Sequence, residues 1–218
     1  MYHVKKCSLK DGDLFSEVKL WNETEFVFLD NIMGETPQFI PETKAALMYD
    51  SENLYGRFTV RDKFVIAKAT QNMEHVWKDS CVELFFTPSD KVAEGYFNLE
   101  MNCTGVIYMQ HQISRGEGRI SIPEENLRSV ITRTTLTEPI PKEIKTETEW
   151  ELVFKFPFEL MKRFHPGFIL PEPGVIWSGN FNKCADESSN PHWITWNKIE
   201  LPKPEFHRPD FFGKFIFD

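Results

Sequence analysis

The sequence has 218 residues, of which 41% are hydrophobic and 27% are charged, as in an ordinary globular domain. Its 25 Lys and Arg against 33 Asp and Glu give a net charge of -8. A chain of this sign without a basic cluster repels phosphate groups, so nucleic acids and anionic membranes are disfavoured as partners. The length fits one β domain over residues 1–218 and leaves the oligomeric state open.

The N-terminal residues and the cysteines indicate the cellular compartment in which the protein is expected. Residues 1–7 contain no apolar segment of the signal-peptide type, and no apolar run reaches 18 residues. The sequence as written therefore predicts a cytoplasmic protein, and a secreted or periplasmic protein whose leader had been removed would look the same. Cys7, Cys81, Cys103 and Cys184 are far apart and form no C-x-x-C pair. This spacing predicts neither a disulfide framework nor a zinc knuckle.

Short runs in which apolar and polar residues alternate are the main pattern in the chain, and they predict β-strands. Residues 43–50 and 53–62 form the first pair, which Ser51 and Glu52 join as a hairpin. Further strands are predicted at residues 80–87, 96–103, 150–156, 174–182, 192–199 and 213–217. Strands of this length, without long helical spacers, favour an all-β, antiparallel two-sheet sandwich over βαβ units.

Helical patterns are weak and short. Residues 158–164 predict one or two turns of helix, which Pro166 and Gly167 end. Residues 115–128 and 170–173 are predicted to be excursions between strands because of their Gly, Glu and Pro content. We therefore expect less than about 15% helix, well below the usual proportion of about a third.

Strand parity assigns the side chains of two predicted strands to opposite faces of a sheet. One face is apolar and is predicted to be buried between the sheets: Val82, Leu84, Phe86, Phe97, Leu99 and Met101. The other face is polar and is predicted to point away from the core: Glu83, Asn98 and Glu100. Polar chemistry on this sheet is therefore expected on the second face.

Glu83 and Glu100 are the best candidates for catalysis, because a glycosidase needs two carboxylates about 5–10 Å apart. An outward-facing Glu on a strand, however, more often belongs to a solvated surface. No G-x-S-x-G, P-loop or H-E-x-x-H motif is present, and the six His residues lack the spacing of a metal site. We predict no catalytic residue and no metal ligand, and a glycoside hydrolase or an accessory subunit of one remains the alternative.

Sugar binding needs flat aromatic rings for the C–H faces of the sugar and polar groups for its hydroxyls. Trp77 precedes a predicted strand and shares its outward side with Glu83. Trp193 and Trp196 are three residues apart, so one of them faces the core and the other is presented. Outward-facing amide and carboxylate groups are expected near these rings: Asn98, Glu100, Asn180 and Asn182.

Several motifs follow one another in a recognisable order. They are Trp77-Lys78-Asp79-Ser80-Cys81-Val82-Glu83, Tyr96-Phe97-Asn98-Leu99-Glu100, Trp150-Glu151-Leu152, Trp177-Ser178-Gly179-Asn180 and His207-Arg208-Pro209-Asp210. In this order they resemble the family 9 carbohydrate-binding modules, and in particular a bacterial branch of stand-alone relatives. The resemblance spans roughly residues 40–218.

The resemblance implies a distorted jelly-roll or immunoglobulin-like sandwich that binds carbohydrate in glycan utilisation without cleaving it. In the family, two Trp side chains clamp a terminal sugar, and Trp77 and Trp196 match them here, with Glu83 as the acidic partner. Further contacts are expected from Asn98, Glu100, Asn182, His207 and Arg208. The Arg that members often place among these contacts is absent. No cofactor is expected, although structural calcium is possible because some members bind it.

Two other functions remain open. Surface Trp side chains could anchor a protein partner instead of a sugar. A haem-binding relative of the sandwich would need a Met/His or His/His pair that faces one cavity, and the inward Met101 has no evident inward His opposite it. The sequence names neither the sugar nor its linkage.

Overall fold

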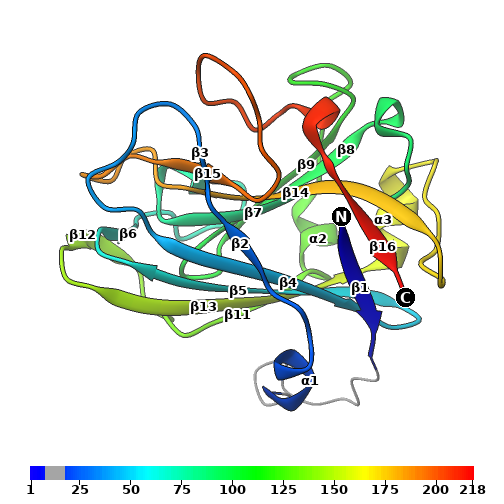
Figure 1. The fold of residues 1–218 in the computed structure, drawn as a ribbon, viewed down its shortest axis with the longest axis horizontal. Helices are drawn as coiled ribbons and strands as arrows, with labels where there is room; N and C mark the ends of the chain where they lie inside the picture. The colour runs from blue at the N-terminus through cyan, green and yellow to red at the C-terminus, as the bar shows by residue number, and fades with distance from the viewer. Residues whose placement is uncertain (8–17) are drawn as a thin grey trace.

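The computed structural model describes residues 1–7 and 18–218, and Figure 1 shows them as two layers of strands. The front sheet has the order β10-β9-β8-β7-β14-β16, with β15 paired to β14 and β3 paired to β15. Its strands are β3 (Asn31–Ile32), β7 (Cys81–Thr87), β8 (Tyr96–Asn102), β9 (Ile107–Gln112), β10 (Ile120–Ser121), β14 (Ile176–Cys184), β15 (Trp193–Thr195) and β16 (Gly213–Phe217).

The back sheet has the order β4-β5-β13-β11, and β2 also pairs with β4. Its strands are β2 (Val27–Leu29), β4 (Glu42–Tyr49), β5 (Asn53–Asp62), β11 (Ile131–Thr134) and β13 (Thr148–Pro157). The hairpin predicted from residues 43–62 is confirmed as β4 and β5, which pair antiparallel from Glu42 opposite Arg61 to Tyr49 opposite Leu54.

Strand β1 (Tyr2–Lys6) joins the two sheets. Residues Tyr2 to Val4 pair with β16, Lys5 and Lys6 pair with β4, and both pairings are parallel. The predicted all-β fold is confirmed, whereas the prediction of separate, purely antiparallel sheets is not. An N-terminal strand is not tied to its neighbours by a short hairpin, so its direction is not fixed in the way that a two-residue turn would fix it.

The remaining elements are short. The helices are α1 (Val18–Asn22), α2 (Glu124–Leu127) and α3 (Phe158–Phe164), the 3-10 turns are η1 (Val76–Lys78), η2 (Val92–Glu94) and η3 (Pro209–Phe211), and β6 (Val65–Ala67) pairs with β12 (Ile140–Ile144). The helix predicted at 158–164 is confirmed as α3, and α2 and β10 lie in the predicted excursion. None of the described helices has the length and apolar character that crossing a membrane requires.

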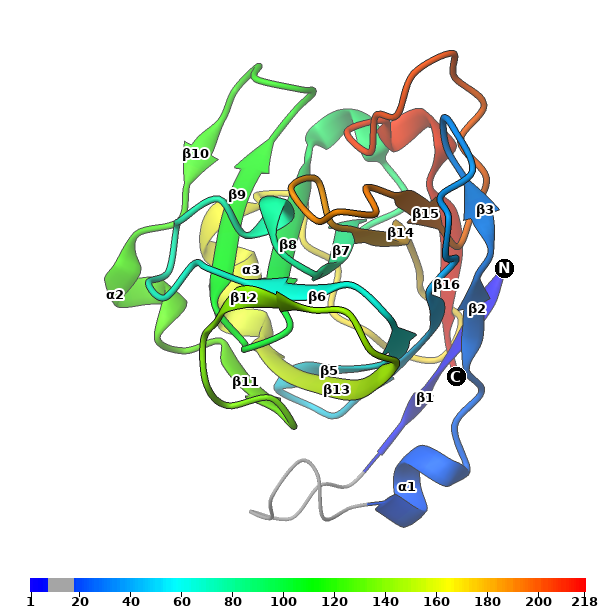
Figure 2. The same cartoon turned by 90° about the vertical axis from the view of Figure 1, so that its left-hand side faces the viewer.

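The hydrophobic core fills the space between the sheets, and Figure 2 shows β7, β8 and β9 in one layer above β5 and β13 in the other. The six side chains predicted to face this core are all buried in it: Val82, Leu84, Phe86, Phe97, Leu99 and Met101. Aromatic rings provide much of the packing; Phe86, for example, stacks on Trp177 with ring centroids 5.9 Å apart. The parity prediction for the inner face is therefore confirmed.

Two buried histidines meet on the inner side of the front sheet. Nε2 of His111, on β9, lies 3.0 Å from Nδ1 of His165, which follows α3. Burial lowers the pKa of His111 to about 4, and His165 lowers it further. Burial also lowers the pKa of His165, against an opposing effect of Glu94. Sequence analysis missed this inward pair, but the direct contact between its rings leaves no place between them for the iron of the haem alternative.

We expect the contribution of this pair to the free energy of unfolding to fall as the pH drops from about 6.5, the ordinary pKa of histidine, to about 4. The unfolded chain takes up protons on both histidines in this range, whereas the folded pair remains neutral because its pKa values are lowered. Chemical unfolding at a series of pH values measures the slope. In His111→Phe one titrating group is gone, so its slope should be shallower; an equal slope in both proteins would contradict the assignment.

A buried ion pair connects the two sheets. Lys183 of β14 points into the core, and its Nζ lies 3.4 Å from Oδ2 of Asp62 at the end of β5. The same Nζ donates to Nε2 of His192 at 2.7 Å and to the carbonyl oxygen of Cys184 at 3.0 Å. Burial and Lys183 lower the pKa of His192 to about 3, so its ring is neutral and can accept this bond. The ammonium group therefore has three partners: the Asp62 carboxylate, the His192 ring and the Cys184 carbonyl oxygen.

Candidate functional site

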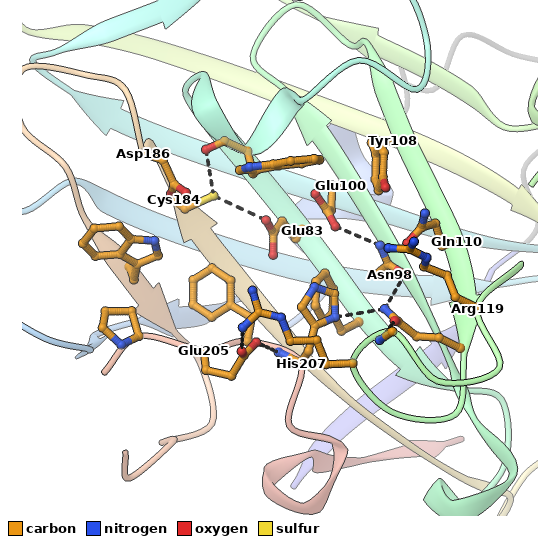
Figure 3. A pocket seen from close by; sticks show the side chains of 18 residues that line it. Glu83, Asn98, Glu100, Tyr108, Gln110, Arg119, Cys184, Asp186, Glu205 and His207 are labelled. Carbon is orange, nitrogen blue, oxygen red and sulfur yellow. Dashed lines mark hydrogen bonds and ion pairs between the residues drawn. The ribbon is translucent and has the colours of Figure 1, made fainter. Parts of the chain in front are cut away.

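A pocket of about 580 Å³ opens on the outer face of the front sheet, and Figure 3 shows its side chains. Strands β7, β8, β9 and β14 form its floor, and the loops around η1, after β9 and before η3 form its walls. The lining residues are Trp77, Glu83, Phe85, Asn98, Glu100, Tyr108, Gln110, Gln112, Arg115, Gly116, Arg119, Cys184, Asp186, Trp193, Pro204, Glu205, Phe206 and His207.

The polar floor of the pocket follows from the register of the strands. Opposite residues in neighbouring strands place their side chains on the same face of a sheet. One row across the floor runs from Asn182 to Glu83, Glu100 and Tyr108, each directly opposite the next. The adjacent row runs across Phe85, Asn98 and Gln110. A single register thus brings together carboxylate, amide and phenol groups from β7, β8, β9 and β14.

Glu83 lies at the centre of this floor. Asn182 donates to its Oε2 at 3.2 Å, and the Cys184 thiol donates to its Oε1 at 3.3 Å. Only 2% of its surface is exposed. Burial raises the pKa of Glu83 to about 7, although the bonds from Asn182 and Cys184 act in the opposite direction.

Glu100 is the nearest acidic neighbour of Glu83 in the register. It is also buried, and Asn98 donates to its Oε1 at 2.8 Å. Burial raises the pKa of Glu100 well above its ordinary value, and repulsion from Glu83 raises it further. Two carboxyl groups so close together favour a state in which one holds a proton, so the floor can offer a hydrogen-bond donor beside an acceptor.

Two tryptophans form aromatic walls of the pocket. Trp77 belongs to η1, and its ring packs edge-on against Tyr108 with centroids 5.0 Å apart. Trp193 begins β15, where it is opposite Cys184 of β14. Both indoles are half-buried, so each keeps part of its ring available to a ligand. Asp186 lines the same pocket beside these rings.

The rim carries basic and neutral polar groups. Arg115 forms an ion pair with Glu205, whose other oxygen accepts from the backbone N–H of His207 at 2.9 Å. Burial lowers the pKa of His207 to about 4, so its ring is neutral. Nδ1 of His207 lies 2.9 Å from the hydroxyl of Tyr96 and 3.0 Å from the amide nitrogen of Gln112. With Nδ1 accepting, the ring carries its proton on Nε2 and acts as a donor there.

The predicted direction of the polar face is confirmed, but the solvated surface that is usual for an outward-facing Glu is not found here. Glu83, Asn98 and Glu100 all point away from the core, yet none is on an open surface, because each is at most 4% exposed. The reason is the covering provided by Trp77, Trp193 and residues 204–207, which come from distant parts of the chain. This enclosure removes the solvent that would otherwise hold carboxylate pKa values near their ordinary range.

Trp196 does not lie in the pocket, so the prediction that it lines a cleft with Trp77 is wrong. Its ring packs inward and stacks on Phe215, with centroids 5.6 Å apart. Gly213 allows this approach, since a Cβ at that position would come within 2.6 Å of the indole. The opposite facing of Trp193 and Trp196 is as predicted, but the presented residue is Trp193.

Of the other predicted site residues, some line the pocket and some do not. His207 lines the pocket, whereas Arg208 lies outside its lining, bonded to Asp210 at 2.9 Å. Asn182 is fully buried beneath the floor and acts on Glu83 instead of lining the cavity. Because Arg208 is bonded to Asp210, two residues further along the chain, its side chain is not available to the pocket.

Several lining residues were not found by sequence analysis. Tyr108 and Gln110 lie on β9, where alternation in the run Ile107–Gln112 was the available signal. Arg115 and Arg119 come from the predicted excursion after it. The chain therefore supplies arginines to the pocket from a turn, although the motif position expected to hold an Arg lacks one.

The cysteines add a further group of donors. Within the described part of the chain, the Sγ atoms of Cys81 and Cys184 and a carboxylate oxygen of Glu83 lie within 4.8 Å of one another. Calcium prefers roughly six to eight oxygen ligands, so a set with two sulfurs does not fit the structural calcium considered from the sequence.

The chain matches known proteins in both sequence and fold. A family model described as carbohydrate-binding family 9 matches residues 15–217. A candidate carbohydrate-binding protein from Bacteroides uniformis has a solved structure with 30% identity and a TM-score of 0.87, over 99% of this chain and 98% of that one. No match was found among curated proteins.

Two further structures are of a family 9 carbohydrate-binding module from Caldicellulosiruptor kristjanssonii. Its complex with glucose has a TM-score of 0.65 at 15% identity and covers 99% of this chain and 94% of that chain. Its complex with cellotriose has a TM-score of 0.64 at 15% identity and covers 99% and 92%. At this identity the likeness concerns the β-sandwich fold.

Proposed function

Because the chain belongs to carbohydrate-binding family 9, we propose that it binds the end of a glycan or a small saccharide in the front-sheet pocket and does not cleave it. The observation that carries this proposal is the pocket itself, in which two half-buried indoles stand over a row of buried carboxyl and amide groups. Aromatic walls with a few fixed polar groups are the usual construction of a small-ligand site.

The chemical roles follow from the contacts. Trp77 and Trp193 offer ring faces for the C–H surface of a sugar. Glu83 and Glu100 offer oxygen acceptors for its hydroxyls, and neutral His207 offers an N–H donor. Their hydrogen bonds to Asn182, Asn98 and Gln112 fix these groups before a ligand arrives, which lowers the entropy cost of binding.

The first ligands to test are glucose and cellotriose. Both occur in complexes with the Caldicellulosiruptor kristjanssonii module, whose fold this chain shares. A pocket of about 580 Å³ lies within the range of roughly 300–1,000 Å³ typical of small-molecule sites, so it has room for a terminal sugar.

A glycoside hydrolase is the second candidate, because Glu83 and Glu100 form a buried carboxyl pair with raised pKa values. A general acid needs such a raised pKa. Both groups, however, project from the same floor at directly opposite positions of β7 and β8. Hydrolysis needs two carboxyl groups that flank the scissile bond, which this arrangement favours less than binding.

We expect Glu83→Gln to weaken glucose or cellotriose binding about 10–100-fold, because a hydrogen bond to a charged group contributes about 1.5–3 kcal/mol. Titration of chelator-treated protein, followed by tryptophan fluorescence, measures this. Glu187→Gln is the matched control, because Glu187 is exposed and pairs with Lys78 at 2.7 Å outside the pocket lining. Equal affinities of the two variants would argue against a role for Glu83.

The same proteins separate binding from cleavage. Each is incubated with polysaccharides and aryl glycosides, and released reducing sugar is measured. Sugar released by wild type but not by Glu83→Gln would establish a hydrolase and overturn the binding-only proposal. Saccharide retention without release would support it, and no response in either assay would instead favour a protein partner for the exposed parts of the tryptophans.

A further inference from the structure

The front-sheet floor contains a second arrangement of donors beside the carboxyl row. Cys81 of β7 is directly opposite Cys184 of β14, and Glu83 lies two residues further along β7. Residues two apart in a strand share a face, so both thiols and the Glu83 carboxylate project to the same side. Their donor atoms lie within 4.8 Å of one another, and all three residues are buried.

The spacing of these atoms suits a metal ion with tetrahedral coordination. Zinc binds thiolate sulfur at about 2.3 Å and carboxylate oxygen at about 2.0–2.2 Å, which sets a sulfur-to-oxygen edge of about 3.5 Å. Sγ of Cys184 lies 3.3 Å from Oε1 of Glu83. The donors therefore need only small shifts to surround such an ion.

The charges around this group also favour a cation. Neighbouring Lys183 points to the opposite face of β14, where it bonds to Asp62 and His192. Cys184 and Glu83 are both buried, so a negative charge on either is far from water. A divalent cation would supply the positive charge that stabilises the thiolates, as metals do for coordinated thiols.

The pocket provides access and a further ligand. Glu83, Cys184 and Asp186 all line it, so an ion can reach the Cys184 thiol and the Glu83 carboxylate from solvent. Figure 3 shows Asp186 next to Cys184, and Oδ1 of Asp186 has no hydrogen-bond partner among the described residues. A water in the pocket, which that oxygen could hold by a hydrogen bond, would complete four-coordination.

We propose that Cys81, Glu83 and Cys184 form a zinc site in the floor of the pocket, with a water molecule as the fourth ligand. Binding releases the protons of the two thiols, and the metal replaces the bond from Cys184 to Glu83. The same pair of cysteines is too far apart in the sequence, 103 residues by their numbers, to read as a zinc motif.

Cobalt is the probe, because thiolate coordination gives Co²⁺ a charge-transfer absorption that Zn²⁺ lacks. The full chain is treated with a chelator, kept reduced with a phosphine, and titrated with Co²⁺ without saccharide. We expect one Co²⁺ per chain, displaced by Zn²⁺. Absence of the charge-transfer band, or a band that Zn²⁺ does not displace, would overturn the site independently of saccharide binding.

Variants identify the ligands. Cys81→Ser and Cys184→Ser should weaken Zn²⁺ binding by more than about 100-fold, since loss of a second-shell partner alone costs about 10–100-fold. Cys103→Ser is the control, because Cys103 is buried in the core and its Sγ lies 3.9 Å from the Ile66 carbonyl oxygen. Weakening by Cys103→Ser to the same extent would contradict the assignment.

Two measurements guard against misfolding and oxidation. Glu83→Gln keeps both thiols and the floor packing, and it should still weaken Zn²⁺ binding if either Ser variant fails to fold. Mass spectrometry after air exposure reports on a Cys81–Cys184 disulfide. A reduced protein that binds neither metal but forms this disulfide in air would identify the pair as a redox pair and overturn the zinc assignment.

Discussion

Replacement of Asp62 by Asn is expected to lower the free energy of unfolding by about 3–5 kcal/mol, the cost of removing one partner from a buried ion pair. Lys183 and Asp62 are both fully buried, and they link β14 of the front sheet to β5 of the back sheet. Without the carboxylate, the ammonium group keeps only its contacts to His192 and the Cys184 carbonyl. Denaturant titration followed by tryptophan fluorescence measures the loss.

Asn is the replacement at position 62 that best isolates the effect of the charge. Oδ1 of Asp62 accepts from the backbone N–H groups of Lys63 at 2.7 Å and Phe64 at 3.2 Å. The Asn side chain retains an oxygen for these bonds, so the variant removes the charge and keeps the turn. The loss should persist at high salt, because a buried pair is screened little.

The double variant Asp62→Asn with Lys183→Met is the matched control. Lys183→Met alone should also be destabilising, because it leaves a buried carboxylate without its cation. Together the two changes remove both charges, and the double variant should be more stable than either single one. If the free energy of unfolding fell by less than about 1 kcal/mol in both single variants, the pair would contribute no more than an exposed salt bridge, which would contradict this account.

Much of the fold could be predicted from strand alternation because that pattern is local. The run Cys81–Thr87 alternates so regularly that Val82 and Glu83 could be assigned to opposite faces without a structure. The strand β1 was missed because its parallel pairing with β16 and β4 depends on residues at distant parts of the chain. Lys183 breaks the pattern, since it faces the core beside apolar residues and is tolerated only through Asp62 and His192.

The site was predicted in its floor but not in its walls. Glu83, Asn98 and Glu100 follow from parity and register, which the strands themselves determine. Their burial depends on loops that cover the sheet, and no local pattern indicates where a loop settles. The offset of three residues showed that Trp193 and Trp196 face opposite ways. Which one faces the pocket is decided by the pairing of Trp193 with Cys184, a contact between separate strands.

Trp77→Ala and Trp193→Ala are each expected to weaken saccharide binding about tenfold or more, the equivalent of 1.4 kcal/mol. An aromatic contact contributes about 0.5–1.5 kcal/mol beyond the apolar area that it buries, and both terms are lost with the ring. The double variant should lose about a hundredfold if the two rings act independently. Fluorescence of the remaining tryptophans, or calorimetry with cellotriose, measures the affinities.

Trp196→Phe is the control that distinguishes the pocket indoles from a core indole. Trp196 stacks on Phe215 and packs against Gly213, so its loss should reduce stability while the affinity for saccharide stays unchanged. Trp193 faces the pocket from only three residues away, so the two variants test neighbouring positions with opposite expected results. If Trp196→Phe weakened binding as much as Trp193→Ala, Trp196, the residue that matches the family pattern, would have to contact the saccharide. Trp193 would then act through the packing of β15 instead of through contact with the sugar.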